Sequence, residues 1–289
     1  MAFSAVRRWW LVACLGGLLA MAGCTRMDLA YRNLDVLIPW TLDDYLDMNR
    51  EQKAWFEERL ADHLRWHCQT QLPGYLPWLD RLRNLAMAQQ VSDEELQALT
   101  REGEQAAEEV ARQITPSAVE LLQGLNEDQV RSLREALAQD IAKRRKELVT
   151  PALAEQVQTR ANNMHKRLLP WLGELHADQD AAILRWSQQL GDHNSVALAN
   201  REQWQQALLA ALAQRSQPAF EGQIAQLLQH RQTLWSDAYR ADRTRAQAAA
   251  RRLTAELLQL SDAGQRQRFV EQLDTLRGRF ATLRCLKKQ

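Results

Sequence analysis

The stretch "LNEDQ" at residues 125–129 decides the fold class of this sequence, because it is a helix start that recurs along the chain. An apolar residue, a polar residue, two mostly charged residues and a glutamine follow in the same order in "MNREQ" at 48–52 and "LHADQ" at 175–179. "LSDAGQ" at 260–265 is a looser copy. The polar side chain can accept from a first-turn amide, acids suit the positive helix end, and the glutamine can reach back to the cap. These starts predict a chain built from successive helices.

The amino-acid composition points the same way. The 289 residues include only 11 glycines and 7 prolines, while leucine, alanine, glutamine, arginine and glutamate dominate, which is typical of long helices. Runs of valine, isoleucine and threonine bounded by hairpin turns are absent. We therefore predict an all-α, multi-helix bundle of about eight to ten helices.

The chain also shows signs of an internal relationship. Ile38-Pro39-Trp40 and Leu169-Pro170-Trp171 each precede a copy of the helix start. This pairing suggests two related helical halves, residues 42–170 and residues 171–289, with the second packed on the first. Other shared features lie at unequal offsets, so the motif can equally be a common way of starting helices, and both interpretations stay open at this point.

Proline positions predict where helices begin and end. Residues 25–41 lack helical periodicity and contain Pro39, so we expect a connecting segment there and helices from Leu42 onward. Pro73 indicates a kink or break in the first long helical stretch. Pro116 and Pro218 are expected to open new helices, the second running to about Leu260.

The first residues have the pattern of a secretory signal. Arg7 and Arg8 precede an apolar run that is too short to span a bilayer as a stable helix. Small residues stand directly before Cys24, and this stretch resembles the lipobox of bacterial lipoproteins. The resemblance implies a signal peptide at 1–23, a lipidated amino terminus and linker at 24–41, and, because Thr25 follows the cysteine, the periplasmic face of the outer membrane. The alternative is ordinary signal cleavage near an unmodified Cys24.

Two further cysteines and the charge balance complete this description. Cys68 and Cys285 are a candidate disulfide in an oxidising compartment, with two separate buried thiols as the alternative. The formal net charge is +1 before signal removal. The chain therefore lacks the surplus of basic residues that binding to nucleic acid requires, and we expect no nucleic acid partner.

The polar residues do not form a recognisable reaction centre. His63 and His67 stand four apart on one expected helix, but the sequence spacing supplies no third metal ligand, and aromatic-lined helix packing explains them better. Acids around Asp43 suit the first turn of a helix without any catalytic role. Phosphate-binding and nucleophile motifs are absent. We expect no catalytic residue, no metal and no cofactor. The candidate binding residues are Trp40, Asp44, Trp66, His67 and Tyr75.

The opening of the mature chain resembles a known family. The Asn-Leu-Asp turn at 33–35, Trp40, the helix start at Asp43-Asp44-Tyr45, Trp66-His67 and Leu72-Pro73 with Tyr75 are similar to a proteobacterial lipoprotein family, domain-of-unknown-function family 6279, as far as about residue 90. The repeated glutamine motif also resembles, more distantly, the LTxxQ motif of periplasmic proteins of the Spy and CpxP type. The first resemblance implies an envelope lipoprotein without a stated reaction, and the second implies binding of unfolded proteins.

These observations predict a membrane-anchored envelope lipoprotein that is not an enzyme. Its expected partners are the membrane, through Cys24, and other envelope proteins, which it binds in a chaperone-like manner. The alternative is a scaffold or assembly factor with one dedicated envelope partner. A metal-dependent enzyme built around His63 and His67 is the remote alternative.

Overall fold

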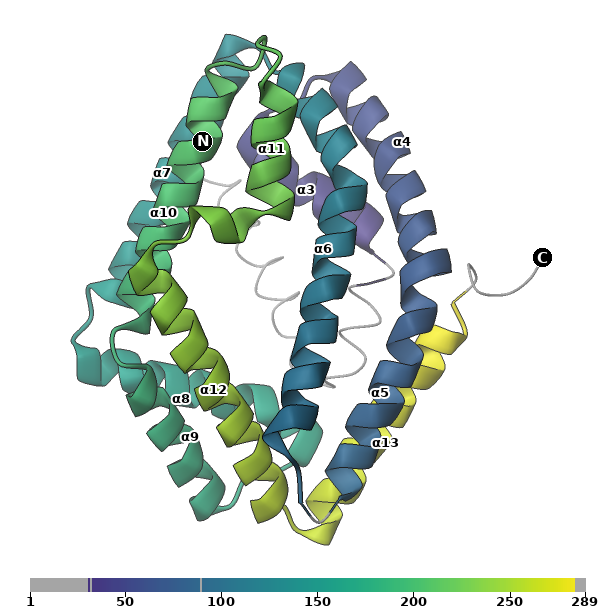
Figure 1. Cartoon of the computed structure of the whole chain (residues 1–289), viewed down its shortest axis with the longest axis vertical. Helices are drawn as coiled ribbons and strands as arrows, with labels where there is room; N and C mark the ends of the chain where they lie inside the picture. Colours follow the sequence, from purple (N-terminus) through teal and green to yellow (C-terminus); the bar gives the residue numbers. More distant parts are fainter. Residues whose placement is uncertain (1–30, 32, 89, 284–289) are drawn as a thin grey trace, which may run out of the picture.

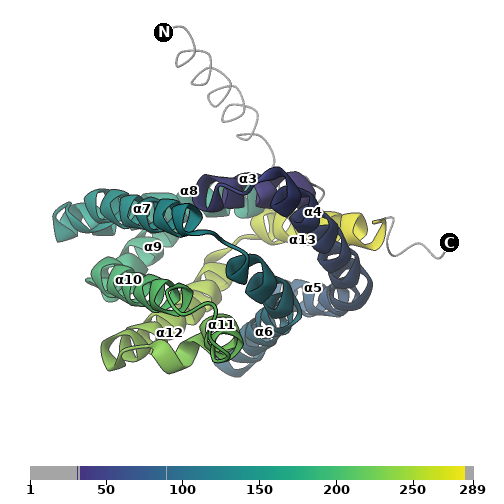
Figure 2. The ribbon, with the colours of Figure 1, turned by 90° about the horizontal axis from the view of Figure 1, so that it is seen from above.

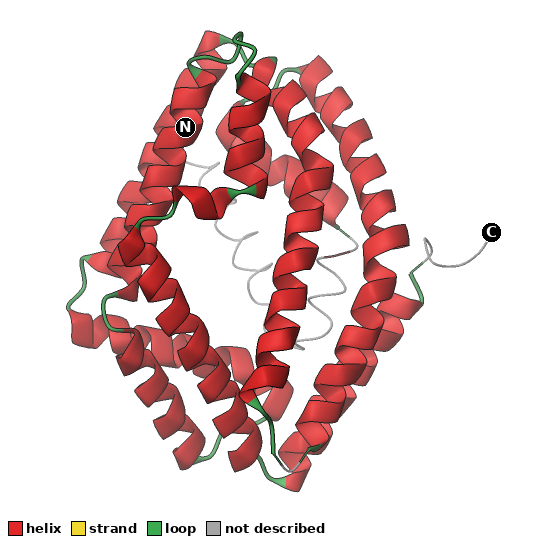
Figure 3. Ribbon diagram, viewed as in Figure 1, coloured by secondary structure: helices red, strands yellow, loops and turns green. Residues whose placement is uncertain are grey.

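The computed structural model describes residues 31, 33–88 and 90–283, and this part of the chain contains eleven α-helices and no strand (Figures 1 and 3). The all-α prediction is confirmed. The helices are α3 (Leu34–Leu46), α4 (Arg50–Trp66), α5 (Leu72–Met87), α6 (Asp93–Gln123), α7 (Glu127–Arg144), α8 (Leu153–Leu172), α9 (Ala177–Leu190), α10 (His193–Leu212), α11 (Phe220–Gln229), α12 (Asp237–Leu260) and α13 (Ala263–Ala281).

The structure corrects three expectations about helix boundaries and agrees with one. Helix α3 begins at Leu34 and includes Pro39, so part of the segment expected as a linker is helical. The interruption expected at Pro73 is present, because α4 ends at Trp66, a π-helical turn, His67–Gln71, follows, and Pro73 lies in the first turn of α5. Helix α6 continues through Pro116. The helix expected from Pro218 to Leu260 is instead divided into α11, a 3₁₀ turn and α12.

The helices form two groups with matching contacts. In the first group α3 packs against α4 and α7, and α4 packs against α6. In the second group α8 packs against α9 and α13, and α9 packs against α12. Other helices lie between the members of one group in sequence but pack against the other group. Helix α5 packs against α13, whereas α10 packs against α7 and α11 packs against α6. Figure 1 shows α5 beside α13 and α11 beside α6.

This reciprocal exchange ties the amino-terminal and carboxy-terminal helices into one framework. The expected boundary between two halves, at residues 170 and 171, falls within the last turn of α8. The matching contacts describe geometry, and a duplication with that boundary stays a prediction.

The repeated helix starts meet in pairs. In the first glutamine junction, formed by the starts of α4 and α7, Gln52 and Gln129 exchange two hydrogen bonds: each side-chain amide donates to the other's oxygen, at 3.2 and 2.7 Å. Each glutamine oxygen also accepts from the backbone amide of its own cap residue, Asn49 or Asn126, at 3.0 and 3.1 Å. The predicted capping boxes are confirmed.

The second glutamine junction joins the starts of α9 and α13 in the same way. Gln179 and Gln265 exchange amide hydrogen bonds of 2.9 and 3.0 Å. The Gln265 amide also donates to the Glu174 carbonyl at 2.8 Å, and the Gln179 amide donates to the Ser261 hydroxyl at 3.3 Å. These two junctions lie near the top and near the bottom of Figure 1, where they fix the turns of the framework.

Buried apolar side chains form clusters between these helices. Leu46, Met48 and Leu125 pack into one cluster with α7, α10 and α11, and Leu72, Leu273 and Phe280 belong to a second cluster between α5 and α13. Viewed from above, α3 lies at one edge of the molecule and α12 at the other (Figure 2). Within the described ranges, no helix combines the length and apolar character needed to cross a bilayer.

Candidate functional site

A cavity of about 1000 Å³ opens between α5, α6, α8 and α13. It lies where α5, which belongs to the first group in sequence, crosses to pack against α13. Its walls are mostly apolar, and the charged side chains among its lining residues are Glu102 and Arg167. Such a volume is at the upper end of typical ligand-binding pockets.

One wall of this cavity is made of small residues. Gly103, Ala106, Ala107 and Val110 stand at spacings of three, four and seven along α6, which places them on a single face of the helix. A Cβ atom added at Gly103 would meet no heavy atom within 4 Å. The space therefore persists because α6 presents no large side chain to fill it.

The opposite walls carry aromatic rings. Trp78 comes from α5, Trp171 from α8, and Phe269 and Phe280 from α13. The rings of Trp171 and Phe269 are tilted against one another with centroids 5.7 Å apart. The Trp78 indole N–H donates to the Leu99 carbonyl at 3.1 Å, which fixes that ring against α6. An apolar ligand would meet rigid aromatic surfaces here.

The rim of the cavity is polar. Glu102 forms an ion pair with Arg81, whereas exposed Arg167 has no ion pair within the described ranges. Thr70, Gln71 and Gln105 also border the opening. An apolar interior with hydrogen-bonding groups at its edge suits a ligand whose apolar part enters and whose polar part stays at the surface.

Three of the five predicted binding residues lie together where α4 meets α5. The ring of His67 lies 6.4 Å from that of Trp66 and 5.6 Å from that of Tyr75. Tyr31 approaches from the other side: its hydroxyl oxygen is 3.0 Å from His67 Nδ1, and that of Tyr75 is 3.2 Å from His67 Nε2. A neutral imidazole donates from one nitrogen and accepts at the other, so both hydroxyls are satisfied together. Tyr75 also lines the cavity.

Burial keeps this cluster uncharged. It lowers the pKa of His67 below its ordinary value, because the charged ring loses solvation. Burial also raises the pKa of Tyr75, and burial together with Tyr75 raises the pKa of Tyr31. The cluster therefore presents neutral aromatic rings at one end of the cavity near neutral pH.

The other two predicted binding residues lie elsewhere. Trp40 and Asp44 are exposed on α3, and neither is among the residues lining the cavity. The side chain of Trp40 is 75% exposed. The structure therefore does not bring all five residues into one site.

The cysteines are described only in part. Cys68 is buried in the cluster that contains Phe280 and Leu283. Cys24 and Cys285 lie outside the described residues, so lipidation of Cys24 and the pairing of Cys68 with Cys285 stay predictions.

The two histidines considered as metal ligands face different neighbours. His63 Nε2 lies 2.8 Å from the Ser117 hydroxyl, whereas His67 contacts the two tyrosines. Within residues 31, 33–88 and 90–283, no three histidine, cysteine or acidic side chains are grouped so that they could hold a metal ion.

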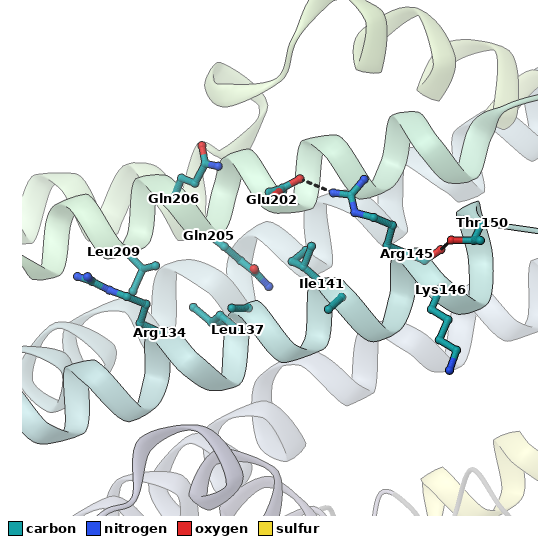
Figure 4. A pocket seen from close by; sticks show the side chains of 12 residues that line it. Arg134, Leu137, Ile141, Arg145, Lys146, Thr150, Glu202, Gln205, Gln206 and Leu209 are labelled. Carbon is teal, nitrogen blue, oxygen red and sulfur yellow. Dashed lines mark hydrogen bonds and ion pairs between the residues drawn. The ribbon is translucent and has the colours of Figure 1, made fainter.

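A second, smaller pocket of about 470 Å³ lies between α7 and α10 (Figure 4). Leu137, Ile141 and Leu209 form its apolar floor, and Arg134 and Lys146 stand at its border. Arg145 donates to Glu202 at 2.9 Å across this pocket, which joins the two helices. It has no aromatic wall, and it is about half as large as the cavity between α5 and α13.

Sequence reasoning missed most of the cavity. Trp78, Trp171, Phe269 and Phe280 come from segments far apart in the chain, and the packing of α13 against α5 and α8 brings them together. The signal that was present in the sequence is the run "GEQAAEEV" at 103–110, whose small residues recur on one face of a charged helix.

The described residues define an all-helical protein with an open cavity lined by aromatic rings. Comparison with known proteins then gives the family. The family of unknown function DUF6279 matches residues 44–240, and the chain belongs to this family. The match extends well beyond residue 90, where the resemblance recognised in the sequence ended, and it begins after Trp40. No curated protein and no solved structure shows a significant match to the chain.

Proposed function

We propose that this protein is a lipid-anchored protein of the cell envelope that binds apolar segments of other proteins in the cavity between α5, α6, α8 and α13. It acts without chemistry of its own, in a chaperone-like manner, and Cys24 carries the anchor. The pattern of residues 7–24 supports the anchor and the location. The open, aromatic cavity is the observation that supports binding.

The size and lining of the cavity favour an apolar stretch of polypeptide. Full burial of one large apolar side chain contributes about 1.5–3 kcal/mol, and about 1000 Å³ is room for several such side chains. The polar rim, with Arg167 and Gln105, can accept the backbone that connects them. Binding of this kind depends on fit to apolar side chains in general, which suits a protein that meets many clients.

A substitution that fills the cavity tests this proposal. Gly103 lies inside α6, and its replacement by phenylalanine meets no atom at Cβ and directs a ring into the cavity. Gly222→Phe is the matched control, because Gly222 is also an exposed helical glycine with no atom within 4 Å of an added Cβ, but it lies on α11.

We expect the processed full-length protein to suppress light scattering by a chemically denatured client. Gly103→Phe should need about tenfold more protein for the same suppression, a difference near 1.4 kcal/mol, while Gly222→Phe should behave as wild type. Equal suppression by the two variants would contradict binding in the cavity. Absence of suppression by the wild type at excess would contradict the chaperone-like function itself.

A further inference from the structure

Helix α3 carries an apolar surface that no other described element covers. Val36 is 55% exposed, Leu37 43% and Trp40 75%. In a helix of 3.6 residues per turn these three side chains fall within a sector of about 100°. We call them the α3 apolar face.

The rest of α3 is bound to the body of the protein. Leu46 is buried in the cluster formed with α7, and Leu42 and Tyr45 pack against the same cluster. Helix α3 lies at an outer edge of the molecule, on the side opposite α12 (Figure 2). The α3 apolar face is therefore held rigidly by its helix and directed away from the core.

The chain leading into α3 is fixed close to the proposed anchor. Tyr31 is held by its hydrogen bond to His67 and by the ring of Phe280, whose centroid is 5.8 Å away. Tyr31 lies seven positions after Cys24, and seven steps along a fully extended chain span at most about 25 Å. A lipidated Cys24 would thus keep the start of α3 within about 25 Å of the lipid surface.

We propose that the α3 apolar face rests in the interfacial layer of the membrane that holds the lipid of Cys24. This inference rests on the proposed lipid anchor. Tryptophan favours such a layer, because its ring is apolar and its N–H can remain hydrogen-bonded. The occupant is thus a phospholipid surface, which α3 meets with its three exposed apolar side chains.

The charges beside this face indicate which lipids it contacts. Asp35 and Asp44 are exposed on α3, so the helix has no electrostatic attraction for an anionic bilayer. Contact depends on burial of the apolar side chains and occurs with zwitterionic phospholipid.

Quenching of tryptophan emission by brominated lipid tests the contact. The processed full-length protein is reconstituted into phosphatidylcholine vesicles with bromines on the acyl chains near the headgroup, and flotation of the vesicles first reports anchoring. Trp40→Phe is compared with Trp235→Phe, since Trp235 precedes α12 at the opposite edge of the molecule. Trp40 is largely exposed, so its replacement leaves the core intact.

The expected result is that brominated lipid quenches part of the emission of wild type and Trp235→Phe, and that Trp40→Phe loses this part. If the protein floats with the vesicles and quenching is equal in all three, the α3 contact is overturned while the anchor stands. If the protein does not float, the anchor fails and the α3 contact with it. If the emission of Trp40 changes with protein concentration and not with bromine, the α3 apolar face contacts a second copy of the protein. That result would overturn the proposal.

Discussion

The two glutamine junctions share a reciprocal pair of amide hydrogen bonds in different surroundings. Gln179 is fully buried and Gln265 is 6% exposed. Gln129 is 5% exposed, but its partner Gln52 is only half-buried. The cap residues differ as well: Asn49 and Asn126 in the first junction correspond to His176 and Asp262 in the second, whose side chains contact each other at 2.9 Å.

This difference shows how one helix-start motif can serve as two kinds of connection. A reciprocal amide pair satisfies both glutamines, so it can be buried without a solvation penalty. The second junction exploits this, and it connects α8, α9 and α13, two of which form walls of the cavity. The first junction, closer to solvent, holds α3 and the group around α7 and α10. We therefore expect the second junction to contribute more to stability.

Removal of the buried amide should have the largest effect. Gln179→Leu leaves the Gln265 side chain without its buried partner, and an unsatisfied buried polar group costs about 1–3 kcal/mol. We expect the free energy of unfolding of the full-length protein to fall by about 2–3 kcal/mol, measured by denaturant titration. The double variant Gln179→Leu/Gln265→Leu should lose clearly less than the sum of the two single variants, because each single change already breaks the pair. Additive losses would show that the two amides do not act together.

The same substitution in the first junction should cost less. Because Gln52 is only half-buried, water can take the place of its amide and hydrogen-bond to Gln129 in the variant. Gln52→Leu should therefore lower the free energy of unfolding by about 1 kcal/mol. The same denaturant titration provides the comparison with Gln179→Leu. A cost equal to that of Gln179→Leu would remove the distinction between the junctions.

The smallest expected effect concerns the cap residues and appears only in acid. The pKa of Asp262 is lowered, first by the hydrogen bond from the backbone amide of Gln265 and then by His176. A carboxyl group with a lowered folded pKa stabilises the protein above its unfolded pKa, and this contribution disappears as the pH falls through the folded value. Asp262→Asn introduces the cap type of the first junction. It should lower stability slightly at pH 7, where the ionised carboxylate contributes, and it should remove the part of the loss below about pH 4 that comes from this carboxyl group.

The control for this effect is Asn126→Asp, which introduces the acidic cap into the first junction. The stability of this variant should fall more at low pH than that of the wild type, because the new carboxyl group becomes protonated there. If Asp262→Asn and wild type lose stability in parallel at low pH, the carboxyl group of Asp262 is not responsible.

The sequence predicts local structure much better than long-range contacts. Asn126 and Gln129 predict a helix start because both partners lie in one turn, and the structure confirms it. That Gln129 meets Gln52, 77 residues away, depends on how helices pack, and periodicity carries no such information. Pro116 misled for a related reason: the contacts of α6 with α4, α11 and α12 compensate for one missing helical bond.

The candidate site shows the same limit. Trp66, His67 and Tyr75 lie close in sequence, and the structure brings them together, whereas Trp40 is separated from them by the turn between α3 and α4. The aromatic wall of the cavity comes from three helices that meet only in the folded chain.

The most direct test of the account is to locate a bound client. A photo-reactive residue at position 103 of the processed protein, with another at position 222 as control, would be illuminated with a defined denatured client, and the crosslinked residues identified by mass spectrometry. We predict efficient crosslinks from position 103 to apolar segments of the client and few from position 222. Equal crosslinking from both positions, or none from position 103 while the client is held soluble, would contradict the assignment of the cavity as the binding site.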